Sequence, residues 1–227
     1  MGSSQDQGEV RSVSRIVSSS LRMGLAHWIS LACGLLRSKV IAILLGPEGL
    51  GLFTTLMSIR AMAQSISDLG VSSSGVRQIA LASAADDPVR LGEVAMCLRR
   101  VSVLSALVGS ALLAAFSGPV SRLVFGTGEY RAEVALMGLA LFLTVQAAAR
   151  KAVVQGVRRV RDLSRMAIIT SLAGMLVAVV SLFAFGIQGV APALVAIALI
   201  DFGVSWIYSR RVVAPATASG WRASFTV

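Results

Sequence analysis

The chain has 227 residues, of which 56% are hydrophobic and 14% are charged, and its formal net charge is +10. Soluble domains contain about 45–50% apolar and about 25% charged residues, so this composition excludes a polar disordered chain and argues against a water-soluble enzyme. The mean hydropathy is +0.79 although the sequence pI is about 11.3, because the basic residues lie in short gaps between long apolar stretches. Nucleic-acid-binding proteins instead spread such residues over a solvated surface. The pattern indicates an all-α polytopic membrane bundle that is not an enzyme and has no nucleic-acid partner.

The first third of the chain predicts a polar tail followed by two membrane spans. Residues 1–15 are polar and charged, and the membrane lobe is expected to cover residues 16–212. Apolar stretches at about 23–45 and 50–69 are long enough to cross a bilayer, which needs about 20 residues of helix. Gly46, Pro47 and Gly49 lie between them and are typical of a tight hairpin turn. Residues 70–85 are expected to form the end of the second span and a cytoplasmic segment.

The rest of the chain predicts four more spans. Uncharged stretches give spans at about 101–121 and 134–150. The long uncharged run between Arg165 and Asp201 is divided by the sequence Gly-Ile-Gln-Gly at 186–189, which predicts a hairpin of two spans at about 166–185 and 190–208. Residues 213–227 are interpreted as a polar coil. The prediction is therefore a bundle of about six transmembrane helices.

The distribution of basic residues predicts the orientation of the bundle. Lys and Arg are frequent in the N-terminal tail, after the second span, after the fourth and at the end of the sixth. They are absent from the turns after the first and fifth spans, and those after the third are offset by Glu129 and Glu133. Because cytoplasmic loops carry the excess of Lys and Arg, we expect both termini to be cytoplasmic.

Residue types that serve as metal ligands or nucleophiles are scarce. The chain has two cysteines, Cys33 and Cys97, and one histidine, His27. The cysteines are interpreted as small buried hydrophobic residues and not as a disulfide. His27 is interpreted as an interfacial residue. The sequence predicts no metal site, no catalytic residue and no bound cofactor.

The charged residues inside the spans are the candidate functional residues. Arg37 lies 11 residues before Glu48 and Arg60 lies 12 after it, so in an antiparallel hairpin both lie roughly 17 Å below the turn. Lys39 lies slightly closer to the turn. Asp201 lies at about 20 Å from the hairpin at 186–189 by the same rise. Three cations and one carboxylate are thus predicted to share one layer of the membrane.

Two interpretations of this layer stay open. In the first, Arg37, Lys39 and Arg60 form the cationic wall of a water-filled cavity that binds an anionic substrate, with Asp201 as a counter-ion. In the second, the same groups form a buried ion network that holds the helices together, and Arg37 and Lys39 extend along a tilted span towards the interface. One carboxylate cannot neutralise three cations, which favours the cavity.

Three motifs carry a resemblance to a known family. Residues 37–53 read RSKVIAILLGPEGLGLF, residues 66–71 read ISDLGV, and residues 75–80 read GVRQIA. These motifs resemble the first hairpin of the polysaccharide exporters, which include the O-antigen flippases. That family belongs to the superfamily that includes the multidrug exporters of the MATE type. The resemblance covers roughly residues 14–212, and beyond the hairpin it consists of spacing and hydropathy.

The resemblance implies a function and a location. It implies a flippase of the bacterial inner (plasma) membrane that moves an undecaprenyl-diphosphate-linked sugar to the outer leaflet for O-antigen, lipopolysaccharide or exopolysaccharide synthesis. It also implies alternating access, coupling to an ion gradient, and a role for Arg37, Lys39 and Arg60 in meeting the diphosphate. Arginine suits that role because its planar fork pairs with two oxygens at once.

The resemblance also predicts an incomplete transporter. Members of this family usually have two lobes and about twice as many spans, so this chain is expected to be the N-terminal lobe of a truncated or split flippase, or a subunit of a homodimer. Two other functions stay open. One is a lobe of a multidrug-type small-molecule exporter, which Asp201 alone supports weakly. The other is an inactive remnant that acts as a scaffold.

Overall fold

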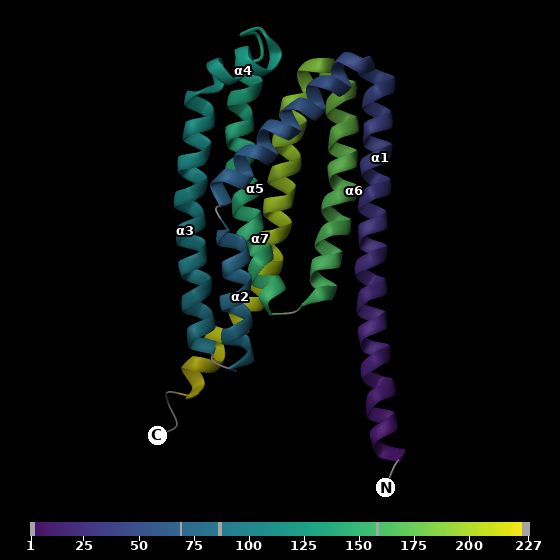
Figure 1. The fold of residues 1–227 in the computed structure, drawn as a ribbon, viewed down its shortest axis with the longest axis vertical. Coiled ribbons are helices and arrows are strands. Elements are labelled where there is room, and N and C mark those ends of the chain that lie inside the picture. The colour runs from purple at the N-terminus through teal and green to yellow at the C-terminus, as the bar shows by residue number, and fades with distance from the viewer. Residues whose placement is uncertain (1–2, 69, 86–87, 158, 224–227) are drawn as a thin grey trace.

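The chain folds into a bundle of long helices that run side by side (Figure 1). The computed structural model describes the backbone of residues 3–68, 70–85, 88–157 and 159–223, and it places no strand in these ranges. In chain order the elements are α1 (Ser3–Asp68), α2 (Val71–Ala84), α3 (Pro88–Ala115), α4 (Ser117–Phe125), α5 (Arg131–Gly156), α6 (Val160–Phe185), the short 3-10 helix η1 (Gly186–Gly189) and α7 (Val190–Ala223).

Four stretches of the described chain are long and apolar enough to cross a membrane, and they are His27–Asp68, Val89–Ala115, Arg131–Gly156 and Val160–Arg210. The first has 42 residues and the last has 51, whereas about 20 helical residues are enough for one crossing. Both fold back within their length, the first at Gly46 and the last at η1 (Figure 1). This arrangement confirms the predicted all-α membrane bundle with about six membrane-crossing helices.

A single glycine bends α1 at one end of the bundle. Gly46 has φ 67° and ψ −166°, a combination that is essentially restricted to glycine. Pro47 follows, and its fixed φ suits the first position of a helix. A Cβ on Gly49 would overlap the Leu45 side chain, so the bend also needs a glycine there. The bend directs the second half of α1 (residues 47–68) obliquely across the bundle (Figure 1).

The second half of α1 stops inside the bundle, and α2 continues towards the opposite end (Figure 1). Gly70 separates the two helices with φ 76°. The Asp68 carboxylate accepts hydrogen bonds from the Ser72 backbone N–H at 3.2 Å and from its hydroxyl at 2.6 Å, which satisfies free donors at the start of α2. Residues 70–85 were expected to form the end of the second span and a cytoplasmic segment; in the structure they are mostly the helix α2, which packs against α3 and α5.

Several helices extend beyond the predicted spans. The fourth span was expected to end near residue 150, but α5 continues to Gly156, because the Lys-Ala-Val-Val-Gln run contains no helix breaker. α1 begins at Ser3, within the predicted tail, and α7 continues to Ala223, past the predicted end of the lobe at residue 212. The outer end of α1, the outer end of α7 and the connections α2–α3 and α5–α6 all lie at one end of the bundle, called here the terminal end (Figure 1). The Gly46 bend, α4 and η1 lie at the other end.

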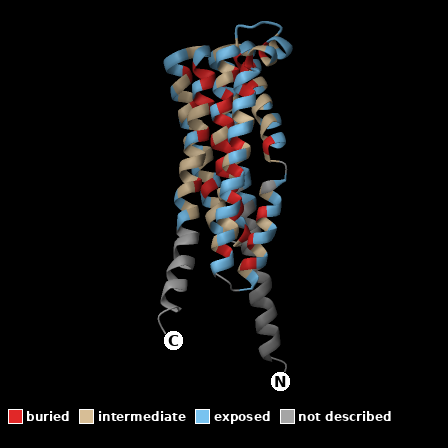
Figure 2. Cartoon of the chain, turned by 90° about the vertical axis from the view of Figure 1, so that its left-hand side faces the viewer, coloured by how far each residue is buried: buried red, intermediate tan, exposed pale blue. Residues whose placement is uncertain are grey.

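The core of the bundle is built around α5. In the 18-residue apolar stretch of α5, 56% of the residues are buried, compared with 11% in the corresponding stretch of α1. Buried residues follow the inner sides of the helices (Figure 2), while many large apolar side chains are exposed, as apolar lipid tails permit. Small residues allow close helix contacts: a Cβ on Gly109 would overlap the Ser67 hydroxyl, and one on Gly138 would lie 2.9 Å from the Ser110 carbonyl oxygen.

Candidate functional site

A cavity of about 300 Å³ lies among the second half of α1, α5, α6 and α7. It contains two cations and one carboxylate, together with three hydroxyl groups. The polar lining residues are Arg60, Thr144, Lys151, Thr170, Ser171 and Asp201. Four helices therefore converge on one polar site inside the bundle, which we call the Arg60 cavity.

An ion pair joins α5 to α7 in the Arg60 cavity. The Lys151 ammonium donates hydrogen bonds to both carboxylate oxygens of Asp201, at 2.7 and 2.8 Å. The Thr170 hydroxyl of α6 donates to Oδ1 of the same carboxylate at 3.2 Å. The side chain of Asp201 is 16% exposed and that of Lys151 is 36% exposed. The carboxylate is thus bound from two neighbouring helices and carries no free charge.

Arg60 enters the cavity from the second half of α1. Its guanidinium donates to the Gln64 side-chain oxygen at 3.3 Å and contacts the Met57 sulfur at 3.7 Å. It forms no ion pair among the described residues, although Asp201 lies close enough for its charge to act on Arg60. Arg60 is therefore a half-buried cation whose only charged hydrogen-bond partner would have to come from a ligand.

Arg37 lies near this site, and Lys39 does not line it. The Arg37 guanidinium lies 5.4 Å from the centre of the Phe53 ring, its buried Nε has no hydrogen-bond partner in the described chain, and its charge acts on Arg60. Lys39 is exposed and is not part of the cavity lining. The reason is helical geometry, because residues two apart on a helix do not face the same way.

The sequence analysis missed Lys151, which is the direct partner of Asp201. It was assigned to the basic segment after the fourth span, because that span was expected to end near residue 150. The structure places it inside α5, where it faces α7 across the cavity. The sequence does indicate a longer helix here, because no helix breaker separates Arg150 from Gly156 and the helix can be extended by a further turn.

The charges of the Arg60 cavity leave a positive surplus. Lys151 and Asp201 neutralise each other, Arg60 has no opposite charge within bonding distance, and Arg37 adds a second cation nearby. An arginine with free donors in an apolar surrounding binds phosphate or carboxylate oxygens through paired, charge-assisted hydrogen bonds. The cavity is also at the lower end of the range of roughly 300–1,000 Å³ that is typical of ligand pockets. The arrangement suits a small anionic group.

Comparisons with known proteins identify the family and a similar fold. A family model described as polysaccharide biosynthesis protein matches residues 17–226. A search of curated proteins finds no match. Among solved structures, the chain is similar to an outward-facing multidrug resistance MATE family transporter of the MOP superfamily, with a TM-score of 0.69 and 16% identity. The match covers 88% of this chain but 44% of the transporter, so the chain spans less than half of the length of that protein.

Proposed function

We propose that this chain, which belongs to the polysaccharide biosynthesis protein family, is one lobe of a flippase that moves a lipid-linked oligosaccharide across the membrane. The family match and the MATE-like fold together support a membrane exporter. The identity of the cargo goes beyond what the family and the fold support. The single observation that carries it is the unpaired Arg60 guanidinium in a cavity whose only described carboxylate is already bound by Lys151.

The chemistry of Arg60 favours a phosphorylated cargo. In the proposed complex the diphosphate of a polyprenyl-linked sugar, of the undecaprenyl type in a bacterial inner membrane, accepts hydrogen bonds from Arg60. Arg37 contributes positive charge beside it. The three hydroxyl-bearing side chains of the lining, Thr144, Thr170 and Ser171, already donate hydrogen bonds within the protein, so their oxygens are suited to accept hydrogen bonds from a sugar. The polyprenyl tail stays in the bilayer, and Lys39 acts outside the cavity, along the route of an approaching anion.

A multidrug-type exporter of cationic compounds is the alternative, and the ion pair argues against it. A cationic cargo would need a free carboxylate, whereas the Asp201 oxygens each accept a hydrogen bond from Lys151. The proposal further includes an opposing lobe, supplied by a second copy or by another segment, against which the Arg60 cavity alternates. The terminal end, with its excess of Lys and Arg, is proposed to face the cytoplasm.

The test uses proteoliposomes that contain the chain and a fluorescent polyprenyl diphosphate disaccharide. Label that reaches the outer leaflet is detected by a quencher that cannot cross the membrane. We expect the wild-type chain to bind the probe and to accelerate its movement, and Arg60→Gln to lower the initial rate at least tenfold. The control is Arg100→Gln, which removes one exposed positive charge from α3 and lines none of the cavities described above.

The outcomes separate the candidate functions. Equal rates for the wild type and Arg60→Gln, with both proteins folded, would refute a role of the Arg60 cavity in flipping. Binding of a lipophilic cation such as ethidium, without binding of the diphosphate probe, would favour the multidrug-type exporter. If the wild-type chain binds neither probe, the scaffold function is the surviving explanation.

A further inference from the structure

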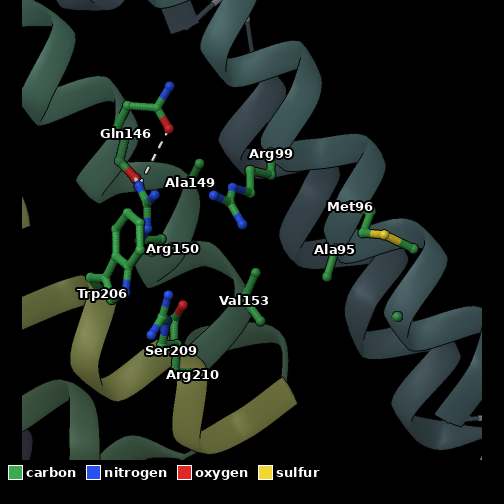
Figure 3. Close-up of a pocket in the computed structure, with 11 residues that line it drawn as sticks. Ala95, Met96, Arg99, Gln146, Ala149, Arg150, Val153, Trp206, Ser209 and Arg210 are labelled. Carbon is green, nitrogen blue, oxygen red and sulfur yellow. Dashed lines mark hydrogen bonds between the residues drawn. The ribbon is translucent and has the colours of Figure 1, made fainter. Parts of the chain in front are cut away.

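A second cavity, of about 170 Å³, lies among α3, α5 and α7. Three arginine side chains, one from each helix, converge around Trp206 (Figure 3). The guanidinium carbon of Arg150 lies 4.8 Å from the centre of an indole ring of Trp206, that of Arg210 lies 4.8 Å from it and that of Arg99 lies 5.6 Å from it. We call this site the Trp206 cavity.

The positive charges of the Trp206 cavity have no counter-ion in the described chain. None of the three arginines forms an ion pair with a described carboxylate, and Arg150 and Arg99 lie close enough to repel each other. The indole ring attracts each cation, but it brings the like charges together without neutralising them. The uncompensated charge of three guanidinium groups around one ring therefore favours the binding of an anion.

A buried donor at the same site points to a missing hydrogen-bond acceptor. Gln146 lines the cavity and is only 2% exposed. Its side-chain oxygen accepts a hydrogen bond from Arg150 at 3.3 Å (Figure 3), whereas its Nε2 has no partner in the described chain. A buried donor without an acceptor destabilises the fold. A ligand that supplies acceptor oxygens would serve Gln146 and the arginines together.

The position of the arginines along the helices points to the membrane interface. Arg99 and Arg100 precede the uncharged run at 101–121, Arg150 follows the one at 134–149, and Arg210 follows the one at 202–209. Each arginine thus stands where an uncharged run ends, in the part of its helix that is nearer the terminal end. Tryptophan is also typical of this level, where the polar headgroups begin. The anions that are present at this level of a membrane are lipid phosphates.

The remaining lining of the cavity is apolar and suits an amphiphilic ligand. Apart from the arginines, Gln146, Trp206 and Ser209, the lining residues are Gly92, Ala95, Met96, Ala149 and Val153. Met96 is 57% exposed, so an acyl chain can lie against it while the phosphate contacts the arginines. Basic pockets between transmembrane helices at the cytoplasmic side bind anionic lipid headgroups in this manner.

We propose that the Trp206 cavity binds the phosphate of an anionic phospholipid of the phosphatidylglycerol type, in the leaflet at the terminal end of the bundle. The site is separate from the Arg60 cavity, because the two use opposite faces of α5. Gln146, Arg150 and Val153 follow the helical repeat on one face, and Thr144 and Lys151 lie on the other. The bound phosphate offsets part of the positive charge of the arginines and bridges α3, α5 and α7.

The test measures lipid binding by the purified chain in a neutral detergent. Native mass spectrometry counts bound phosphatidylglycerol, with phosphatidylcholine as the neutral comparison lipid. We expect saturable binding of phosphatidylglycerol by the wild type, and at least tenfold weaker binding by Arg99→Gln and by Arg210→Gln. These two side chains are exposed, so both variants are expected to fold, and a lipid-dependent rise of the melting temperature serves as a second readout in each.

Arg100→Gln is the matched control, since it removes the same charge from the neighbouring position on α3 and does not line the cavity. Its binding should stay within twofold of the wild type. An equal loss in Arg100→Gln, or equal binding of phosphatidylcholine, would overturn the proposal in favour of diffuse surface attraction. Complete competition by inorganic phosphate would identify a soluble anion as the ligand. Displacement of phosphatidylglycerol by a polyprenyl diphosphate at lower concentration would assign the site to the cargo.

Discussion

The Arg60 cavity and the Trp206 cavity both hold several cationic side chains inside an apolar bundle, but they compensate that charge in different ways. In the Arg60 cavity a lysine and an aspartate from neighbouring helices form a close ion pair, and one arginine is left over. In the Trp206 cavity three arginines surround an indole ring and no described carboxylate pairs with them. The two cavities lie on opposite faces of α5, so one helix contributes lining residues to both.

The difference shows what each cavity requires from outside the chain. A charge in a membrane helix is costly unless it has a partner or faces water. The Lys151–Asp201 pair meets this requirement internally and serves the fold, whereas the Trp206 cavity meets it only with a ligand. Removing a cation should therefore destabilise the first site and relieve repulsion in the second.

The largest effect is expected when the ion pair is broken. Lys151→Met leaves the Asp201 carboxylate, which is 16% exposed, without its cation. Removing one partner of a buried pair costs about 3–5 kcal/mol; because the Lys151 side chain is 36% exposed, we expect about 3 kcal/mol less free energy of unfolding. Denaturation in mixed micelles, followed by helical circular dichroism, measures the change.

A double variant provides the control for this prediction. Lys151→Met combined with Asp201→Asn removes both charges and should regain most of the lost stability. Arg99→Gln, measured in lipid-free detergent, should not destabilise the chain at all. A comparable loss in Lys151→Met and in Arg99→Gln would mean that the two cavities do not differ in the way described.

A smaller effect is expected at the bend that brings Arg60 to its cavity. Gly46→Ala places a side chain on a backbone with φ 67° and ψ −166°, and such a strained residue costs about 1–3 kcal/mol. We expect about 2 kcal/mol of destabilisation and weaker binding of the diphosphate probe, while phosphatidylglycerol binding stays unchanged. The control is Gly51→Ala, where a Cβ would meet no atom within 4 Å. A loss of both ligands would show that the bend acts on the whole bundle.

The smallest effect is expected when a carboxylate is introduced into the Trp206 cavity, which then has an internal ion pair as the Arg60 cavity does. Gln146→Glu places a carboxylate beside Arg150, whose guanidinium already donates to this side chain at 3.3 Å. Position 146 is only 2% exposed, so the cost of desolvating the new carboxylate offsets most of the attraction, and we expect a net gain of at most about 1 kcal/mol. The melting temperature in lipid-free detergent should rise slightly, and its further rise on adding phosphatidylglycerol should disappear. If the lipid-dependent rise persists unchanged, the arginines are not the lipid site.

The fold was largely predictable from the sequence, because uncharged stretches and glycine-containing turns mark the crossings directly. The structure adds features that depend on tertiary packing. The polar residues of α2 suggested an exposed segment, and Ser73, Ser74 and Arg77 are indeed exposed. On its other side, Ile79 is fully buried and packs with residues of α3 and α5, a contact that polarity alone does not reveal.

The candidate site was predictable only in part. Depth along the hairpins placed Arg60 and Asp201 in one layer, and the structure puts both at one cavity. Depth does not give the direction in which a side chain points, so Lys39 could not be separated from Arg37. Lys151 lies 50 residues before Asp201 in the chain, and only the packing of α5 against α7 reveals the pair. The arginines of the Trp206 cavity were interpreted only as indicators of membrane orientation, because their convergence also depends on how α3, α5 and α7 pack together.

The most direct test of the two-cavity account is a crossed binding measurement on one preparation. The affinities for a polyprenyl diphosphate disaccharide and for phosphatidylglycerol are measured in the wild type, in Arg60→Gln and in Arg99→Gln. The account predicts that Arg60→Gln weakens only the diphosphate at least tenfold, and that Arg99→Gln weakens only the phospholipid by a similar factor. If either variant weakens both ligands equally, the two cavities are not independent sites and the account is contradicted.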